Sequence, residues 1–219
     1  MDQLTLLYRV MVLLLGHHPK RRADAAFVFG RAQGDFEATD GDSGILEKAA
    51  GLYRNDLVAF VIIPSQEAGV AHGGKSVATT FPGTQVFRRN LEELGVPQQA
   101  IVVPGDYVPY TRAEGDAYVR LAKERGWTSA VTIQHPHQAP RTMLGLLKSF
   151  AACQHHMHVV PDYPWSVNWS KRVYGSQGAQ LLPRHEHIQE EWRRILEYQA
   201  KGDLASWEEL EHYLADHVS

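Results

Sequence analysis

The chain has 219 residues, of which 44% are hydrophobic and 21% are charged, a globular composition that excludes disordered and fibrous proteins. Lys and Arg total 22 and Asp and Glu total 25, so the net charge of −3 lacks the basic excess of nucleic-acid-binding proteins, and no nucleic-acid partner is expected. The single cysteine, Cys153, excludes a disulfide framework and indicates a reducing compartment, so we expect a cytoplasmic protein.

The N-terminal segment from Leu4 to Gly16 is strongly apolar but only 13 residues long, and Arg9 interrupts it. A transmembrane helix needs about 20 apolar residues, so no transmembrane segment is expected. A secretory signal carries its positive charge before the apolar run, whereas here the basic residues Lys20–Arg22 follow it. We therefore expect residues 1–22 to form a helix packed on the core and a basic linker. The alternative is a helix that lies on a membrane surface.

Strand and helix patterns alternate along the rest of the chain. Continuous apolar runs predict strands, and amphipathic segments predict helices. In chain order the predicted elements are a strand at Ala25–Gly30, a helix at Gly44–Asn55, a strand at Leu57–Ile63, a helix at Gly83–Leu94, a strand at Ala100–Val103, a helix at Thr111–Arg125, a strand at Ser129–Gln134, a helix at Arg141–Ala152, a strand at Met157–Val160, and helices at Ile188–Ala200 and Leu204–His217. This order predicts one three-layer α/β/α Rossmann-like domain over residues 1–219. Its mainly parallel sheet has about five strands, with an extra N-terminal helix and a C-terminal helical clasp at residues 185–219.

Ligands of such folds bind in the loops beyond the carboxyl ends of the strands, where the order of the strands reverses. The loop after the first strand begins GRAQG, and its Gly30, Arg31 and Gly34 suit a close approach of the backbone to a ligand. An ordinary strand-to-helix turn is the alternative. Two other loops, Pro64–Pro82 and Pro161–His187, are long enough to indicate a functional role.

The segment Gly69–Ser76, GVAHGGKS, matches the pattern of a phosphate-binding loop, in which Lys75 would reach the terminal phosphate of a nucleotide. Such a loop follows a strand directly and starts a helix. Here Pro64–Ala68 intervenes after the strand, and the residues that follow include Pro82 and β-branched side chains that disfavour a helical turn. A flexible glycine-rich loop is the preferred interpretation, and a phosphate-loop nucleoside triphosphatase is an alternative function.

Motifs occur around the third and fourth strands. In chain order they are Gly95-Val96-Pro97 before the third strand, Thr111 and Glu114 after it, Val131-Thr132 in the fourth strand, and His137 and Arg141 after it. In this order they resemble the YdcF, SanA and ElyC family of bacterial proteins, a domain of unknown function, from about Ala25 to about Val160. The resemblance implies a Rossmann-like fold, binding of S-adenosylmethionine or a nucleotide, and links to cell-envelope metabolism for the membrane-anchored members. The chain departs from the family in its first two loops and lacks the anchor of SanA and ElyC.

Polar residues follow four of the predicted strands, so we expect them to meet at the carboxyl edge of the sheet. The predicted ligand-binding residues are Gly30, Arg31, Gly34, Ser65, Thr111, Glu114, His135, His137 and Arg141. His137 and Glu114 are the candidates for acid–base catalysis, and Arg141 is expected to bind an anion through two parallel hydrogen bonds. The alternatives are a capping box for Thr111 and Glu114, a solvated loop position for His137, and a carboxylate partner for Arg141.

Histidine is unusually frequent, with 12 residues, and the pairs His135-Pro136-His137 and His185-Glu186-His187 contain the ligand types of a metal site. Neither pair has a recognised metal-binding spacing, so no metal is expected. The aromatic segment Tyr163–Tyr174 forms either a lid over the ligand or an anchor that pins its loop to the core.

The sequence therefore predicts a soluble YdcF-like protein that binds a small anionic ligand at the carboxyl edge of its sheet. The ligand class is a nucleotide or S-adenosylmethionine, with or without hydrolase or transferase activity. The alternative is a non-catalytic binding protein in cell-envelope homeostasis. The patterns predict no particular oligomeric state.

Overall fold

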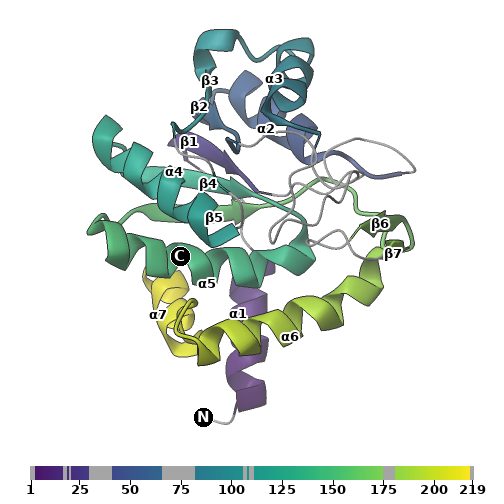
Figure 1. The fold of residues 1–219 in the computed structure, drawn as a ribbon, viewed down its shortest axis with the longest axis vertical. Coiled ribbons are helices and arrows are strands. Elements are labelled where there is room, and N and C mark those ends of the chain that lie inside the picture. Colours follow the sequence, from purple (N-terminus) through teal and green to yellow (C-terminus); the bar gives the residue numbers. More distant parts are fainter. Residues whose placement is uncertain are drawn as a thin grey trace.

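The computed structural model describes residues 3–16, 19, 21–29, 41–65, 82–105, 108, 111–174 and 181–217, and Figure 1 shows how they fold. The first elements are α1 (Gln3–Leu15), β1 (Ala23–Val28), α2 (Ile45–Arg54), β2 (Val58–Ile62), α3 (Thr84–Glu93), the short 3-10 helix η1 (Gln98–Ala100) and β3 (Ile101–Val102). They are followed by α4 (Thr111–Arg125), β4 (Ser129–Ile133), η2 (Pro136–Gln138), α5 (Ala139–Cys153), β5 (His158–Asp162), β6 (Arg172–Tyr174), β7 (Leu181–Pro183), η3 (Arg184–Glu186), α6 (His187–Ala200) and α7 (Trp207–His217). Every predicted strand and helix is present, with its ends shifted by at most a few residues.

β1 lies at the centre of a five-stranded parallel sheet whose order is β3-β2-β1-β4-β5. Ala26 of β1 pairs with Val61 of β2 on one side and with Val131 of β4 on the other. The predicted parallel sheet is therefore confirmed, with Leu57–Ile63 at an internal position. The chain moves outward from β1 to β3 and then returns to the other side of β1 for β4, so the strand order reverses between β1 and β4. Open α/β sheets bind their ligands at this switch point.

Alternate side chains of β1 point to opposite faces of the sheet and are buried in two separate hydrophobic clusters. Ala25 and Phe27 join the cluster with α4, α5 and the terminal helices, whereas Ala26 and Val28 join the cluster with α2 and α3. Figure 1 shows the same three layers, with α4 and α5 on one side of the sheet and α2 and α3 on the other. The structure is therefore a three-layer α/β/α domain of Rossmann-like type.

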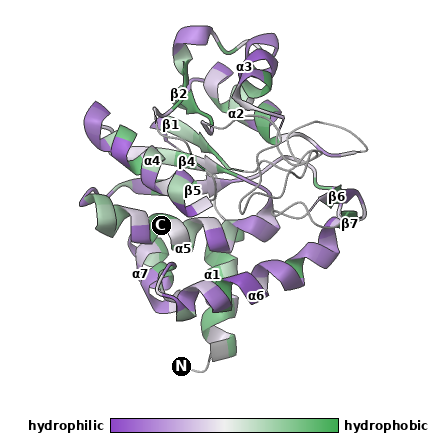
Figure 2. Ribbon diagram, in the orientation of Figure 1, coloured by the Kyte–Doolittle hydropathy of each residue, from purple (hydrophilic) through white to green (hydrophobic). Residues whose placement is uncertain are grey.

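α1 packs on the outer side of the α4–α5 layer, beside α7 (Figure 1). Leu6, Val10 and Leu14 recur every fourth residue and are buried in the same cluster as α5, as expected for a helix packed on the core. Figure 2 shows α1 as hydrophobic along most of its length, and its outer side exposes the apolar side chains Leu4, Tyr8, Val12 and Leu15. Among the described helices, none combines the length and the hydropathy needed to cross a membrane.

The long loop from Pro161 to His187 contains a two-stranded antiparallel sheet of β6 and β7 that the sequence analysis did not predict. Each strand has only three residues, and Val173 of β6 pairs with Leu182 of β7. After β7 the chain enters α6, which runs along the α5 side of the molecule to α7 (Figure 1). This path brings α6 into contact with η2, the turn that follows β4.

Candidate functional site

The polar residues predicted after β3 and β4 lie at the carboxyl edge of the sheet, next to its switch point. Thr111 and Glu114 belong to the first turn of α4. His135 and His137 lie in the turn after β4, and Arg141 belongs to the first turn of α5. One turn and two helix starts therefore contribute to one region, as expected from the topology.

Of the other predicted residues, Ser65 is described, and it too lies beyond the carboxyl end of a strand. Ser65 follows β2, where its carbonyl oxygen accepts a hydrogen bond of 3.1 Å from the amide of Val108. Outside the described residues lie Gly30, Arg31 and Gly34 of the first loop and the phosphate-loop pattern Gly69–Ser76. The described part of the candidate site therefore comes from the turn after β4, from the starts of α4 and α5, and from α6.

The guanidinium group of Arg141 is held by a carboxylate from α6. Its Nε and Nη2 atoms lie 2.5 and 3.2 Å from the two carboxylate oxygens of Glu191, and its Nη1 donates to the hydroxyl of Thr111 at 2.9 Å. The Arg141 and Glu191 side chains are 10% and 4% exposed, so this is a buried bidentate ion pair. Arg141 therefore has the carboxylate partner that the sequence left open as an alternative, and the pair as a whole is neutral.

The ion pair shifts the pKa values of both partners. Burial by itself raises the pKa of Glu191, but the charge and hydrogen bonds of Arg141, with the charges of Arg194 and His137, hold that pKa below its usual range. Burial likewise lowers the pKa of Arg141, and Glu191 more than offsets this effect, so the pKa of Arg141 is raised. Both groups are therefore charged at neutral pH, and His137 lies near enough to interact electrostatically with Glu191.

Glu114 is a buried carboxyl group at the end of β1, with only 1% of its surface exposed. The hydroxyl of Tyr118, one turn later on α4, lies 3.1 Å from Glu114 Oε1 and 2.8 Å from the carbonyl oxygen of Val28, the last residue of β1. Glu114 also interacts electrostatically with Arg141. This candidate acid–base group therefore lies in the interior, close to the switch point.

His135 and His137 stack on each other in the turn after β4, with ring centroids 6.0 Å apart. The ring of His137 also makes an edge contact with Trp169 from the loop after β5, at a centroid distance of 6.1 Å. His135 is fully buried, whereas Trp169 is 39% exposed. His137 is therefore not a solvated loop residue, because it lies between a buried ring and a partly exposed one.

Gln134, the residue that directly follows β4, was missed as a candidate by the sequence analysis. It has no solvent exposure, and neither polar atom of its side-chain amide has a hydrogen-bond partner among the described residues. The backbone amide of Phe29 donates to the carbonyl oxygen of Ile133 at 2.8 Å, so the pairing of β1 with β4 continues up to Gln134. The sequence did contain a signal, because Gln134 is a polar residue at the end of an apolar run. It was counted as the last residue of the predicted strand Ser129–Gln134 and was given no functional role.

The loop after β5 is fixed to the start of α2 by a buried cluster of charges. The two carboxylate oxygens of Asp42 accept hydrogen bonds from Arg184 at 2.8 and 2.7 Å, and Lys171 Nζ lies 3.2 Å from the same carboxylate. The backbone amide of Asn168 also donates to Asp42. Burial raises the pKa of Asp42, but the hydrogen bonds and charge of these partners hold it below its usual range.

A second buried ion pair joins α2 to the end of β5. Lys48 Nζ lies 2.9 Å from Asp162 Oδ2, and the two side chains are 8% and 1% exposed. The Lys48 ammonium also lies 4.9 Å from the ring centroid of Trp165, and this ring packs so closely on α2 that a Cβ at Gly51 would fall 2.7 Å from it. The segment Tyr163–Tyr174 is therefore attached to α2, but Trp165 is 62% exposed and does not pin it to the core as the anchor interpretation expected.

Among the described residues, no three His, Cys, Asp or Glu side chains lie close enough together to hold a metal ion. The second histidine pair instead binds backbone within the loop after β5. A ring nitrogen of His185 lies 3.0 Å from the carbonyl oxygen of Trp169, and one of His187 lies 2.9 Å from that of Val173. These histidines therefore hold this loop against the start of α6.

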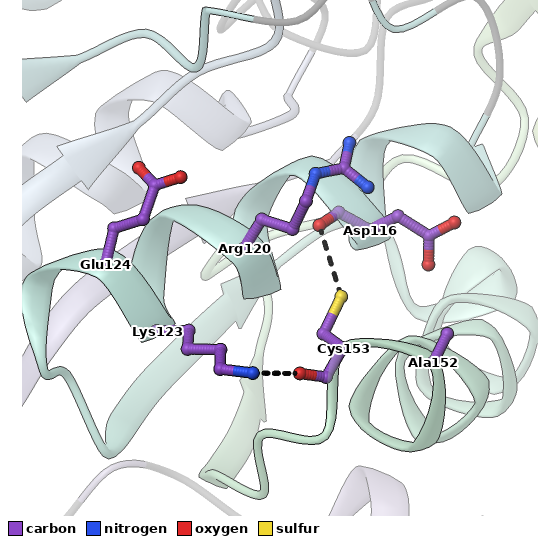
Figure 3. A pocket seen from close by; sticks show the side chains of 6 residues that line it. All are labelled: Asp116, Arg120, Lys123, Glu124, Ala152 and Cys153. Atoms are coloured by element: carbon purple, nitrogen blue, oxygen red, sulfur yellow. Dashed lines mark hydrogen bonds between the residues drawn. The ribbon is translucent and has the colours of Figure 1, made fainter.

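A surface cavity of about 370 Å³ lies between the C-terminal halves of α4 and α5, and Figure 3 shows its lining residues Asp116, Arg120, Lys123, Glu124, Ala152 and Cys153. Both helices begin near the carboxyl edge of the sheet, so their C-terminal ends lie toward the amino edge, away from the candidate site. Lys123 is directed at the backbone carbonyl of Cys153, 2.8 Å away (Figure 3). Because charges of both signs line the cavity, it offers no preference for an anionic ligand.

The thiol of Cys153 is expected to react slowly with alkylating reagents. Burial, and then the charge of Asp116, raise its pKa above the usual range, against the opposing charges of Arg120 and Lys123. Since the thiolate is the nucleophile, alkylation by iodoacetamide at neutral pH should be slower than for free cysteine, and it should accelerate as the pH rises toward the raised pKa. Mass spectrometry measures both rates, and a rate equal to that of free cysteine would contradict the assigned environment.

Comparison of the chain with protein-family models, with curated proteins and with solved structures finds no match. The resemblance to the YdcF, SanA and ElyC family therefore stays a prediction from the motifs. The geometry itself consists of a Rossmann-like sheet whose switch point is surrounded by Gln134, His137, Glu114 and the ion pair of Arg141 with Glu191. Such a concentration of polar groups is typical of a binding or catalytic site.

Proposed function

We propose that this protein binds a small molecule of the nucleotide or S-adenosylmethionine class at the carboxyl edge of its sheet, at the switch point between β1 and β4. The observation that carries the proposal is the polar network at that edge, in which Arg141 donates hydrogen bonds to both Thr111 and Glu191. Glu114 interacts electrostatically with Arg141, and His137 with Glu191. The network occupies the position at which open α/β sheets bind their ligands.

Burial of charged groups supports a functional role for the network. Burying charges is costly even when they are paired, and well-packed apolar replacements of a buried ion pair are often neutral or stabilising, so stability alone does not account for the network. The N-terminal end of α5 adds the positive end of a helix dipole, which favours a phosphate or carboxylate group of the ligand. Because Arg141 and Glu191 compensate each other, the pair contributes hydrogen bonds and rigidity, and the helix end supplies the preference for an anion.

The proposed function has an enzymatic and a non-catalytic version. In the enzymatic version, His137 transfers a proton to or from the bound ligand and Glu114 is a second acid–base group, which fits hydrolase or transferase chemistry. In the non-catalytic version the protein only binds its ligand, in line with the envelope role that the family resemblance implies. Chromatography of nucleotides and sugar phosphates after incubation distinguishes the two. A phosphate-loop triphosphatase would instead hydrolyse ATP with magnesium and lose this activity on Lys75→Ala.

Replacing His137 with alanine is expected to weaken ligand binding about tenfold or more. A tenfold loss corresponds to about 1.4 kcal/mol, which is at the upper end of the range for one ordinary hydrogen bond and just below the range for one to a charged group. The measurement is isothermal titration calorimetry with S-adenosylmethionine, adenine nucleotides and sugar phosphates. His156→Ala is the matched control, because His156 is an exposed histidine in the turn before β5. Equal affinities of the parent and His137→Ala, or equal losses in both variants, would contradict the proposed position of the site.

A further inference from the structure

Gln134 places a primary amide in the interior of the protein at the switch point of the sheet. The residue has 0% exposure, and neither Nε2 nor Oε1 has a hydrogen-bond partner among the described residues. The polar side chains of β4 itself differ, since Ser129 Oγ donates to Asp24 at 2.8 Å and Thr132 Oγ1 lies 3.8 Å from the sulfur of Met143.

An amide in this state lowers the stability of the protein. Folded proteins satisfy roughly 90% or more of their buried polar groups, so an unsatisfied group needs a specific explanation. A site that is complementary to a ligand accepts such a loss of stability, because the ligand supplies the missing hydrogen bonds. Gln134 lies where the topology of the sheet predicts the ligand, directly after the strand that borders the switch point.

We propose that Gln134 recognises an uncharged edge of the ligand that presents a donor beside an acceptor, as a nucleobase does. This inference rests on the proposed function and names the part of the ligand that reaches β4. A primary amide holds one donor and one acceptor group at a fixed spacing, and glutamine binds adenine through such a pair of hydrogen bonds. An ionised phosphate or carboxylate presents acceptors only, so it would leave Oε1 of Gln134 unsatisfied.

The aromatic rings that follow Gln134 suit the flat shape of a base. His135 is its chain neighbour, and the ring of His135 stacks on His137. His137 in turn contacts the edge of Trp169, which is 39% exposed and therefore has ring surface available. Aromatic faces stack on any nucleobase, whereas the amide of Gln134 provides the directional contact.

Replacement of Gln134 by methionine is expected to raise the melting temperature of the ligand-free protein by about 2 °C or more, because methionine has a similar length and removes the unsatisfied groups. Gln199→Met is the matched control. Gln199 Nε2 donates to the carbonyl oxygen of Ala205 at 2.7 Å, so the same change removes a hydrogen bond and should lower the melting temperature. An unchanged or lowered melting temperature for Gln134→Met means that the amide is already satisfied, and this result overturns the inference.

The ligand-binding test uses adenosine, guanosine, cytidine, uridine and inorganic phosphate in calorimetric titrations of the parent and of Gln134→Met. We expect the parent to bind at least one nucleoside and the variant to bind it about tenfold more weakly or worse, with any affinity for inorganic phosphate unchanged. If the parent binds nucleotides or sugar phosphates and Gln134→Met binds them equally well, the inference fails while the proposed function stands. If the parent binds neither the nucleosides nor any nucleotide, sugar phosphate or S-adenosylmethionine, both fail.

Discussion

Replacing Arg141 with alanine is expected to lower the free energy of unfolding by about 3–5 kcal/mol, the range for breaking a buried ion pair. The change removes two hydrogen bonds to Glu191 and one to the hydroxyl of Thr111. The buried carboxylate of Glu191 then keeps its contact with Arg194 of its own helix, 3.4 Å away, but loses the two shorter contacts to Arg141. Unfolding in guanidinium chloride, followed by circular dichroism, measures the loss.

The double variant Arg141→Met/Glu191→Met separates the ion pair from the volume of its side chains. It removes both charges together, and well-packed apolar replacements of a buried ion pair are often neutral or stabilising. The double variant should therefore lose much less stability than the sum of its two single variants. Additive losses would mean that the two side chains do not form the ion pair described above.

Acid should weaken the same contact. The pKa of Glu191 is lower in the folded protein than in the unfolded chain, so its contribution to stability is fully present above the unfolded pKa. This contribution is lost as the pH falls through the folded pKa. The double variant Arg141→Met/Glu191→Met lacks this carboxyl group. Its free energy of unfolding should therefore not show the decrease in acid that Glu191 causes in the parent.

The fold was predictable from the sequence because its elements follow local patterns. The continuous β-branched run Leu57–Ile63 is typical of a strand that is buried on both faces, and β2 is such an internal strand. Regular alternation of strands with helices implies parallel pairing by right-handed crossovers, which limits the possible topologies. The three-residue strands β6 and β7 were missed, since segments so short have no periodicity to detect.

The partners within the candidate site were not predictable, because they join distant segments. Arg141 and Glu191 are 50 positions apart, and Asp42 and Arg184 are 142 positions apart. Glu191 lies on a helix whose apolar spacing indicates packing only, so its role depends on where α6 crosses η2. Topology alone was sufficient to bring Thr111, His137 and Arg141 to one edge of the sheet, but it does not determine whether a guanidinium there is paired.

Replacing Asp42 with alanine is expected to have a comparably large effect, with a loss of about 3–5 kcal/mol in the free energy of unfolding. Arg184 is 0% exposed and Lys171 is 7% exposed, and both would lose the carboxylate that compensates their charges. The backbone amide of Asn168 would lose its acceptor as well. Because this carboxylate joins the start of α2 to the loop after β5, amide hydrogen exchange should accelerate first in residues 163–174 and 181–186.

Arg193→Ala is the control that separates the effect of burying an ion pair from the effect of removing a positive charge. Arg193 also forms two ion pairs, with Glu190 and Glu197 at 2.9 Å each, but it is 60% exposed and both partners are more than a third exposed. Exposed ion pairs add little to stability, so this variant should unfold like the parent. Because Arg193→Ala keeps Asp42, whose folded pKa is lowered, its stability should fall in acid as that of the parent does, whereas Asp42→Ala should lack this part of the pH dependence. Equal losses of stability in Asp42→Ala and Arg193→Ala would contradict the buried position of the Asp42 cluster.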